Sequence, residues 1–304
     1  MNRKLLLIII LFINTVVFSQ ERYKDSVFSN ILSKTYEYAV KDTTSLKLDF
    51  YEAREDTLQK RPLFIFVHGG GFSSGKRDHK EIINLAKQVA SRGYVVASLS
   101  YRLTRKGKSF GCDCPKADKI EAFRAAGEDI TDAVLFLLES PDTFRIDEEK
   151  IILSGSSAGA EGILNLAYNK SILFAEEDKY RNIKPAAVVS LAGAILDSRY
   201  ITETNVIPGI FFHGTADPLV PYASGAHHYC DPEKIGYLML DGSATIVSKL
   251  KTLNQSFLFY SFVDANHDVF KIPFKRLNEI FNFMSRVVIN NKFYQANITV
   301  NKGE

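Results

Sequence analysis

The stretch Ile151-Ile152-Leu153-Ser154-Gly155-Ser156-Ser157-Ala158-Gly159 contains the pattern G-x-S-x-G directly after a short apolar run. The segment that follows, Ala158–Tyr168, is helix-like, so the pattern predicts a strand, a sharp turn at Ser157 and then a helix. Gly155 and Gly159 lack the side chains that would collide where strand and helix close together. On such a turn the serine hydroxyl points out of the sheet, beside the positive end of the helix dipole. The stretch therefore predicts an exposed, activated serine in an α/β fold.

Short apolar runs recur on both sides of this stretch, and their lack of alternation is typical of strands buried on both faces of a parallel sheet. They are Leu63–Val67, Tyr94–Leu99, Ile151–Leu153, Ala186–Leu191, Gly209–Phe212 and Phe257–Phe262. Helix-like segments lie between and after them, at Asp78–Ser91, Ile120–Glu139, Ala158–Tyr168, Ala244–Leu253 and Phe274–Val288. Ahead of them, Tyr36–Val40 and Leu46–Phe50 alternate polar and apolar residues, which predicts an antiparallel hairpin. We therefore expect one domain over residues 20–304, with a mostly parallel central sheet, an antiparallel N-terminal hairpin and helices on both faces.

A second motif, His68-Gly69-Gly70-Gly71-Phe72, follows the run Leu63–Val67. Consecutive glycines let the backbone approach a substrate and aim its N–H groups inward. The amides of Gly70, Gly71 and Ala158 are therefore candidate donors to an oxyanion. The plainer alternative is a flexible loop or a phosphate cradle, but the spacing G-x-x-x-x-G-K-[ST] of a phosphate-binding loop is missing. We expect His68 itself to hold this loop rather than to act as a base.

Two further motifs follow strands farther along the chain. His213-Gly214-Thr215-Ala216-Asp217-Pro218 comes after Gly209–Phe212, and Asp264-Ala265-Asn266-His267-Asp268 comes after Phe257–Phe262. Because the carboxyl ends of parallel strands share one edge of the sheet, Asp217 and His267 are expected to lie near Ser157. The chain order Ser, Asp, His is that of the α/β-hydrolases and differs from the order in chymotrypsin or subtilisin.

Each member of this set has an alternative. Asp217 could simply cap a helix that begins at Pro218. Asp264 or Asp268 could supply the acid, although Asp268 is poorly placed to reach the ring of its neighbour. The rival bases are His213, His227 and His228.

Taken together, the four motifs resemble the α/β-hydrolases of the carboxylesterase and lipase type, close to the hormone-sensitive-lipase-like and secreted polysaccharide-esterase branches. The resemblance starts at Leu46-Lys47-Leu48-Asp49-Phe50-Tyr51, which is similar to the strand before the HGGG motif in such enzymes, and runs to Val288. The serine motif reads GSSAG where the lipase branch often has GDSAG, and Ala265 stands where many relatives carry a glycine. Neither departure removes a reacting group. The resemblance implies a catalytic triad of Ser157, Asp217 and His267, an oxyanion hole of Gly70, Gly71 and Ala158, an acyl-enzyme intermediate, and no cofactor or metal.

The first residues have the layout of a cleavable signal peptide. Arg3 and Lys4 precede the apolar run Leu5–Ile13, and small residues precede a cleavage point after Ser19. An uncleaved N-terminal anchor is the alternative, but the run is short for a membrane span. No second run reaches that length, so we expect residues 1–19 to be removed and the rest to be secreted or periplasmic, with no stable membrane span. The net charge of +3, from 38 basic and 35 acidic residues, gives no footprint for nucleic acid.

The chain has three cysteines, Cys112, Cys114 and Cys230. In an oxidising compartment we expect one disulfide from Cys230 to one of the other two, and one free thiol. A Cys112–Cys114 bond is disfavoured because a single intervening residue forces a strained ring. A metal site that also uses His227 and His228 is a weaker alternative, because its cysteine spacing is atypical for zinc.

These observations favour a serine ester hydrolase that acts on a small-molecule or carbohydrate-linked ester. A serine peptidase of the same fold is the runner-up, but such enzymes usually add a gating domain, for which no residues are left before Ser157. A non-catalytic binding protein on this scaffold typically lacks a triad member, and none is missing here. The loop 102–119 is rich in cations, which favours a solvated face over an attraction for acidic esters. Its basic residues are Arg102, Arg105, Lys106, Lys108, Lys116 and Lys119.

Overall fold

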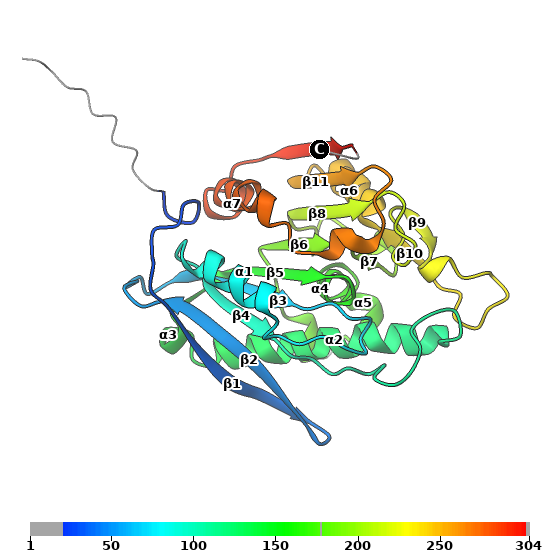
Figure 1. The fold of residues 1–304 in the computed structure, drawn as a ribbon, viewed down its shortest axis with the longest axis horizontal. Helices are drawn as coiled ribbons and strands as arrows, with labels where there is room; N and C mark the ends of the chain where they lie inside the picture. Colours follow the sequence, from blue (N-terminus) through cyan, green and yellow to red (C-terminus); the bar gives the residue numbers. More distant parts are fainter. Residues whose placement is uncertain (1–20, 177, 302–304) are drawn as a thin grey trace, which may run out of the picture.

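The computed structural model describes residues 21–176 and 178–301, and the expected signal peptide at residues 1–19 lies outside them. Nine strands form the main sheet in the order β1-β2-β4-β3-β5-β6-β8-β11-β12 (Figure 1). Their bounds are β1 Ile31–Lys41, β2 Thr44–Ala53, β3 Arg61–Val67, β4 Val95–Leu99, β5 Ile146–Ser156, β6 Ala187–Leu191, β8 Gly209–Gly214, β11 Phe257–Phe262 and β12 Gln295–Val300.

The expected sheet architecture is confirmed. The β1–β2 and β2–β4 pairs are antiparallel, and every pairing from β4 through β12 is parallel. The β1–β2 hairpin reaches out from the body of the molecule, as the blue ribbon in Figure 1 shows. Leu46, Leu48 and Phe50, the apolar positions of the predicted alternation, are all buried in β2.

Helices cover both faces of the sheet. One face holds α1 (Lys80–Ala90) and α7 (Leu277–Met284), and the other holds α2 (Lys116–Leu138), α4 (Ala158–Tyr168) and α6 (Ser243–Thr252). Every residue of β3 is buried, because the strand sends Leu63 and Ile65 into one core and Phe64 and Phe66 into the other. A strand covered on both faces shows no polar alternation, which explains the continuous apolar runs.

Several smaller elements were not expected from the sequence. They are the edge strand β12, a second sheet of β7 (Ala194–Ile195), β10 (Met239–Gly242) and β9 (Ser224–Ala226), and the short helices α3 (Pro141–Phe144) and α5 (Lys170–Leu173). The helix predicted over Phe274–Val288 is divided into a 3-10 turn η5 (Phe274–Arg276), α7 and a π-helical end η6 (Ser285–Ile289). No helix within the described residues is long and apolar enough to cross a membrane.

Candidate active site

Ser157 occupies a strained turn between β5 and α4. Its φ of +51° is in the left-handed region that side chains other than glycine rarely adopt. A Cβ atom on Gly155 would lie 2.5 Å from the Gly159 backbone, and one on Gly159 would lie 2.2 Å from the carbonyl oxygen of Val67. The two glycines of the motif therefore let strand and helix close at this turn, and the Ser157 side chain remains partly exposed.

Three side chains from separate strand ends form a continuous chain of hydrogen bonds. Ser157 Oγ lies 2.8 Å from His267 Nε2, and His267 Nδ1 lies 2.7 Å from Asp217 Oδ2. A carboxylate only accepts hydrogen bonds, so His267 donates from Nδ1 and presents Nε2 to the serine hydroxyl as an acceptor. His267 begins the 3-10 turn η4 (His267–Phe270), and Asp217 lies in the loop after β8. The structure thus brings together the three residues singled out in the sequence.

The Asp217 carboxylate is almost fully buried. Its Oδ1 accepts hydrogen bonds from the amides of Leu219, at 2.9 Å, and Val220, at 3.0 Å, while Oδ2 faces the imidazoles of His267 and, at 3.4 Å, His213. Burial raises the pKa of Asp217, but the contacts with His213, His267 and the backbone outweigh it and hold the pKa well below its usual range. The segment at Pro218 is not a helix, so Asp217 does not cap one as the alternative suggested. Its Oδ1 accepts from amides of its own loop, and its Oδ2 contacts His267.

The rival residues have other partners. Asp268 is exposed and pairs with Lys271 at 2.8 Å, while the amide of Asp264 donates to Thr215 Oγ1. His213 is buried, with Nδ1 2.8 Å from Ser243 Oγ. His227 and His228 lie in the disulfide-linked segment described below, and neither is hydrogen-bonded to Ser157 or Asp217.

The glycine-rich loop runs directly beside the serine. A Cβ atom on Gly69 would lie 3.1 Å from the Ser157 Cβ, and Gly70 and Gly71 adopt φ values of +119° and +59°. The Gly70 carbonyl accepts hydrogen bonds from the amides of Ser73 and Ser74, both at 3.0 Å, which fix the turn of the loop. Ala158 is the first residue of α4, so its N–H is one of those with no acceptor within the helix.

His68 contacts the backbone of this loop, in agreement with the structural role expected for it. Its Nδ1 lies 2.7 Å from the Gly69 carbonyl oxygen, and its ring packs on Tyr101 at 4.6 Å between centroids. The Tyr101 hydroxyl donates to the His68 carbonyl at 2.9 Å. Burial lowers the pKa of His68 and outweighs the opposing effect of the Gly69 carbonyl, so the imidazole is neutral.

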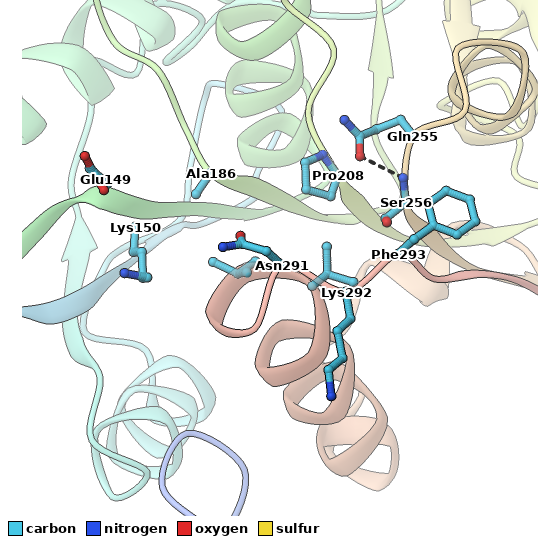
Figure 2. Close-up of a pocket in the computed structure, with 11 residues that line it drawn as sticks. Glu149, Lys150, Ala186, Pro208, Gln255, Ser256, Asn291, Lys292 and Phe293 are labelled. Atoms are coloured by element: carbon cyan, nitrogen blue, oxygen red, sulfur yellow. Dashed lines mark hydrogen bonds between the residues drawn. The ribbon is translucent and has the colours of Figure 1, made fainter.

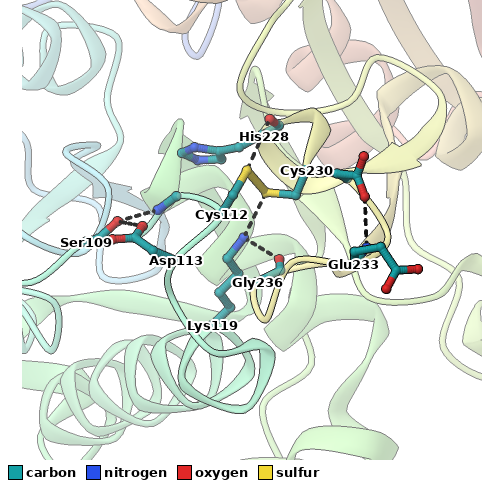
Figure 3. The surroundings of a disulfide bond; sticks show 10 residues. Ser109, Cys112, Asp113, Lys119, His228, Cys230, Glu233 and Gly236 are labelled. Atoms are coloured by element: carbon teal, nitrogen blue, oxygen red, sulfur yellow. Dashed lines mark hydrogen bonds between the residues drawn. A yellow bond between two sulfur atoms is a disulfide. The ribbon is translucent and has the colours of Figure 1, made fainter.

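A disulfide joins Cys112, in the loop after β4, to Cys230, in the segment after Asp217 (Figure 3). This agrees with the expectation of one link between these two segments, and it selects Cys112 rather than Cys114, which is a buried free thiol. Next to the bond, the fully buried Lys119 donates to the Gly236 carbonyl at 2.8 Å, and its Nζ lies 3.9 Å from Cys230 Sγ. No cluster of three or more metal-ligating side chains occurs within the described part of the chain.

The structure uses half of the cations in the loop 102–119 internally. Arg102 pairs with Asp129 and Glu128 at 2.8 and 2.6 Å, Arg105 pairs with Asp118 at 2.7 Å, and Lys119 is buried. These three cations are structural. The loop is therefore not fully solvated, and it offers fewer free charges to attract an acidic ester than its composition indicated.

Sequence reasoning did not identify a buried pair behind the serine. Glu161, four residues after Ser157 on α4, is 1% exposed, and its Oε1 lies 3.3 Å from Nε2 of His227. Burial, with a further contribution from Asp217, raises the pKa of Glu161, and burial lowers that of His227. The signal that could have found the pair was the single acid on the mostly apolar helix AGAEGILNLAY.

A pocket of about 260 Å³ adjoins the site between the glycine-rich loop, α1 and the segment after His267. Its walls include Gly69, Gly70, Ile82, Phe270 and Ile272. Phe270 also stacks on the His267 ring, with centroids 5.3 Å apart, so one wall of the pocket is fixed to the imidazole.

Comparisons with known proteins agree with this fold. The family model described as BD-FAE matches residues 48–197, a range that contains the glycine-rich loop and the serine turn. Among solved structures, a thermophilic esterase from the planctomycete Thermogutta terrifontis, Est2, superposes with a TM-score of 0.62 and 20% identity, over 84% of this chain and 92% of that one. Its propionate-bound form (TM-score 0.61, 19% identity, 88% and 97% coverage) and its form phosphorylated by paraoxon (0.62, 19%, 84% and 94%) are similarly close. No curated protein sequence matches this chain.

The order of the sheet, the serine turn after β5 and the similarity to solved esterases show that the chain has the α/β-hydrolase fold. The BD-FAE model matches residues 48–197 of this fold, the part that carries both glycine motifs.

Proposed function

We propose that this chain hydrolyses carboxylic esters through a Ser157–His267–Asp217 triad and an acyl-enzyme intermediate. The single observation that carries the proposal is the hydrogen-bonded chain from Ser157 Oγ through His267 to Asp217, with distances of 2.8 and 2.7 Å. Both contacts are within hydrogen-bonding reach before any substrate binds, so the nucleophile and its base are already positioned for proton transfer.

In the proposed mechanism, Ser157 Oγ attacks the ester carbonyl carbon while its proton moves to His267 Nε2. The carbon–oxygen bond to the alcohol then breaks as His267 returns the proton to the leaving oxygen. Water, deprotonated by the same imidazole, releases the acyl group from Ser157. Asp217 stabilises the imidazolium during both acylation and deacylation. The amides of Gly70, Gly71 and Ala158 bind the oxyanion, and one such donor contributes about 3 kcal/mol of transition-state stabilisation in comparable sites. No cofactor or metal takes part in these steps.

Small acyl esters or acyl groups on polysaccharides are the proposed substrates. The adjoining pocket of about 260 Å³ supports a group of limited size. Phe270 and Ile272 form an apolar part of its wall, and Lys76, Glu81 and Lys271 also line it. The solved structures of the Thermogutta esterase with propionate and with butyrate bound support short acyl chains by analogy. The chain has no tryptophan, so any sugar platform must be built from tyrosine or phenylalanine.

A serine peptidase of the same fold remains the alternative activity, since the same triad can attack an amide. We also propose that the protein is secreted or periplasmic, which the Cys112–Cys230 disulfide supports because such bonds persist in oxidising compartments. Sequencing the N-terminus of the exported protein tests this, and a chain that retains residues 1–19 would contradict it.

The substrate proposal is tested with p-nitrophenyl esters from acetate to palmitate, beside acetylated and feruloylated xylan and an amide analogue of the best ester. We expect kcat/KM to be greatest for short acyl chains and the amide to be turned over far more slowly. A preference for palmitate, or equal cleavage of the amide, would contradict the proposed substrate class.

A further inference from the structure

A pocket of about 490 Å³ opens at the edge of the main sheet opposite the serine. Its walls come from α5, from the segment that leads into β6 and from the loop that leads into β8. Strands β6 and β8 begin at this edge, whereas Ser157 and Asp217 follow the carboxyl ends of β5 and β8. The eleven residues of α4 separate the two places by about 16 Å. The pocket is therefore not part of the proposed active site.

Cations gather at this pocket without acids among its lining residues. Lys170, Arg181, Lys184 and Arg199 line it, and only Arg199 has a carboxylate partner, Asp197, among the described salt bridges. Lys170 is half-buried, and its ammonium donates to the Ile183 carbonyl. Burial, with the charges of Lys184 and Arg181, lowers the pKa of Lys170 to about 8. Like charges held this close repel one another, and a bound anion would relieve that repulsion.

The rest of the lining suits a sugar. Ser171, Thr202 and Thr204 carry hydroxyl groups at the pocket wall, and Tyr200 is 40% exposed beside them. An exposed tyrosine ring offers a flat apolar face, and hydroxyl groups can both donate to and accept from the hydroxyls of a carbohydrate. Inorganic anions alone would make no use of the aromatic ring.

A second hollow continues the first along the same edge of the sheet. It has a volume of about 440 Å³, and its lining includes Ala186, Pro208 and Phe293 (Figure 2). One acid and two cations, Glu149, Lys150 and Lys292, also line it. Ala186 and Pro208 directly follow Pro185 and Ile207, which line the first pocket, so the two hollows share two chain segments. Phe293 is 52% exposed and supplies a second aromatic face.

We propose that this edge binds an acidic oligosaccharide, whose carboxylate or sulfate groups meet Lys170, Arg181 and Lys184 and whose rings contact Tyr200 and Phe293. The inference goes beyond the proposed hydrolase activity and does not require it. Such a site would hold an acidic polymer on one side of the molecule while the serine faces the other.

The test is isothermal titration of the full protein with oligogalacturonate, a heparin-derived oligosaccharide, neutral xylo-oligosaccharide and inorganic phosphate. We expect binding of at least one acidic oligosaccharide, weaker binding at higher salt, and no binding of the neutral one. The carboxylate and sulfate probes distinguish the two sources of charge. Failure of both acidic probes, or phosphate that binds as tightly as they do, would overturn the proposal.

Variants place the ligand within the pocket. The double variant Arg181→Ala/Lys184→Ala should weaken binding about tenfold or more, because two charge-assisted contacts are lost. Lys179→Ala is the matched control, since this neighbouring cation already pairs with Asp132 at 2.7 Å and does not line the pocket. If the double variant is unstable, Lys184→Gln alone replaces it. Unchanged binding in the pocket variants would overturn the assignment.

Ester hydrolysis separates this inference from the proposed function. The pocket variants should cleave p-nitrophenyl acetate at the unmodified rate, whereas Ser157→Ala should keep full affinity for the acidic oligosaccharide. Loss of oligosaccharide binding in Ser157→Ala would mean that the ligand occupies the active site, and would overturn the proposal.

Discussion

The Asp217 carboxylate divides its two oxygens between two tasks: Oδ2 lies 2.7 Å from His267 Nδ1, and Oδ1 accepts from the amides of Leu219 and Val220. The backbone contacts fix the carboxylate, and the carboxylate in turn fixes the imidazole. With Nδ1 of His267 hydrogen-bonded to Oδ2, the ring presents Nε2 to Ser157 Oγ.

Replacing Asp217 with Asn should lower kcat by about three to four orders of magnitude, because an amide can present its N–H to His267 and favour the wrong tautomer. The matched control is Asp268→Asn, an exposed acid next to His267 that pairs with Lys271. The measurement is steady-state hydrolysis of p-nitrophenyl acetate, with circular dichroism to check the fold. If Asp268→Asn lowers kcat and Asp217→Asn does not, the acid of the triad is Asp268 and not Asp217.

Replacing Ser157 with Ala should lower kcat by about six orders of magnitude while leaving the fold intact, since the change removes one hydroxyl from a partly exposed turn. The same change should abolish phosphorylation by paraoxon, the compound that phosphorylates the Thermogutta esterase. Mass spectrometry detects the adduct, and Ser156→Ala is the control that should still be labelled. A paraoxon adduct on any other serine would show that Ser157 is not the nucleophile.

The sequence predicted the parts of this structure that depend on local constraints. Gly155 and Gly159 are required by backbone contacts of 2.5 and 2.2 Å, and such requirements are visible as residue types at fixed spacing. The strand β12 was missed because only some of its residues are buried, so Gln295–Val300 lacks a continuous apolar run. The Glu161–His227 pair was missed because it joins residues far apart in the chain, and no spacing rule links them.

Replacing Gly70 with Ala should reduce kcat more than it changes KM. A Cβ atom there would lie 2.2 Å from the Ser74 carbonyl oxygen, and the φ of +119° is unfavourable for alanine. The loop must therefore shift, and an oxyanion donor moves out of place, which in comparable sites costs about 10²–10³ in kcat. Gly107→Ala is the control, because its φ is also positive at +72° but its Cβ would have open space. Equal losses in both variants would indicate a general loss of stability instead of a displaced donor.

The contribution of His228 to stability should fall as the pH decreases from about 6.5 to 4, while the buried Glu161, whose pKa is raised, acts in the opposite direction. Burial, with Lys119 and His267, lowers the pKa of His228 to about 4, and burial also lowers that of His227. In this range the unfolded chain binds protons at these histidines and the folded chain does not, so acid favours unfolding. A shift of this size for His228 corresponds to at most about 3 kcal/mol.

Urea unfolding at pH 7.5, 6 and 5 measures this effect, with His228→Gln as the variant. The variant should lose less stability than the unmodified protein between pH 7.5 and 5. The exposed His79 provides the control, since His79→Gln should leave the pH dependence unchanged. A His228→Gln variant with an unaltered pH dependence would show that His228 is not the group responsible.

Thiol counting should find one reactive cysteine per chain after denaturation without reductant, because Cys112 and Cys230 are bonded and Cys114 is free. In the folded protein that thiol should react slowly, since it is buried and burial raises its pKa. The bond joins residues 118 positions apart, so the chain-entropy model assigns it a stabilisation of up to about 5 kcal/mol. Cys112→Ser should therefore unfold at much lower urea concentration and expose two thiols, whereas Cys114→Ser should keep the stability of the unmodified protein and expose none. A Cys112→Ser variant that exposes no thiol and keeps its stability would contradict this expectation. It would mean that Cys230 can form the disulfide with Cys114 when Cys112 is absent.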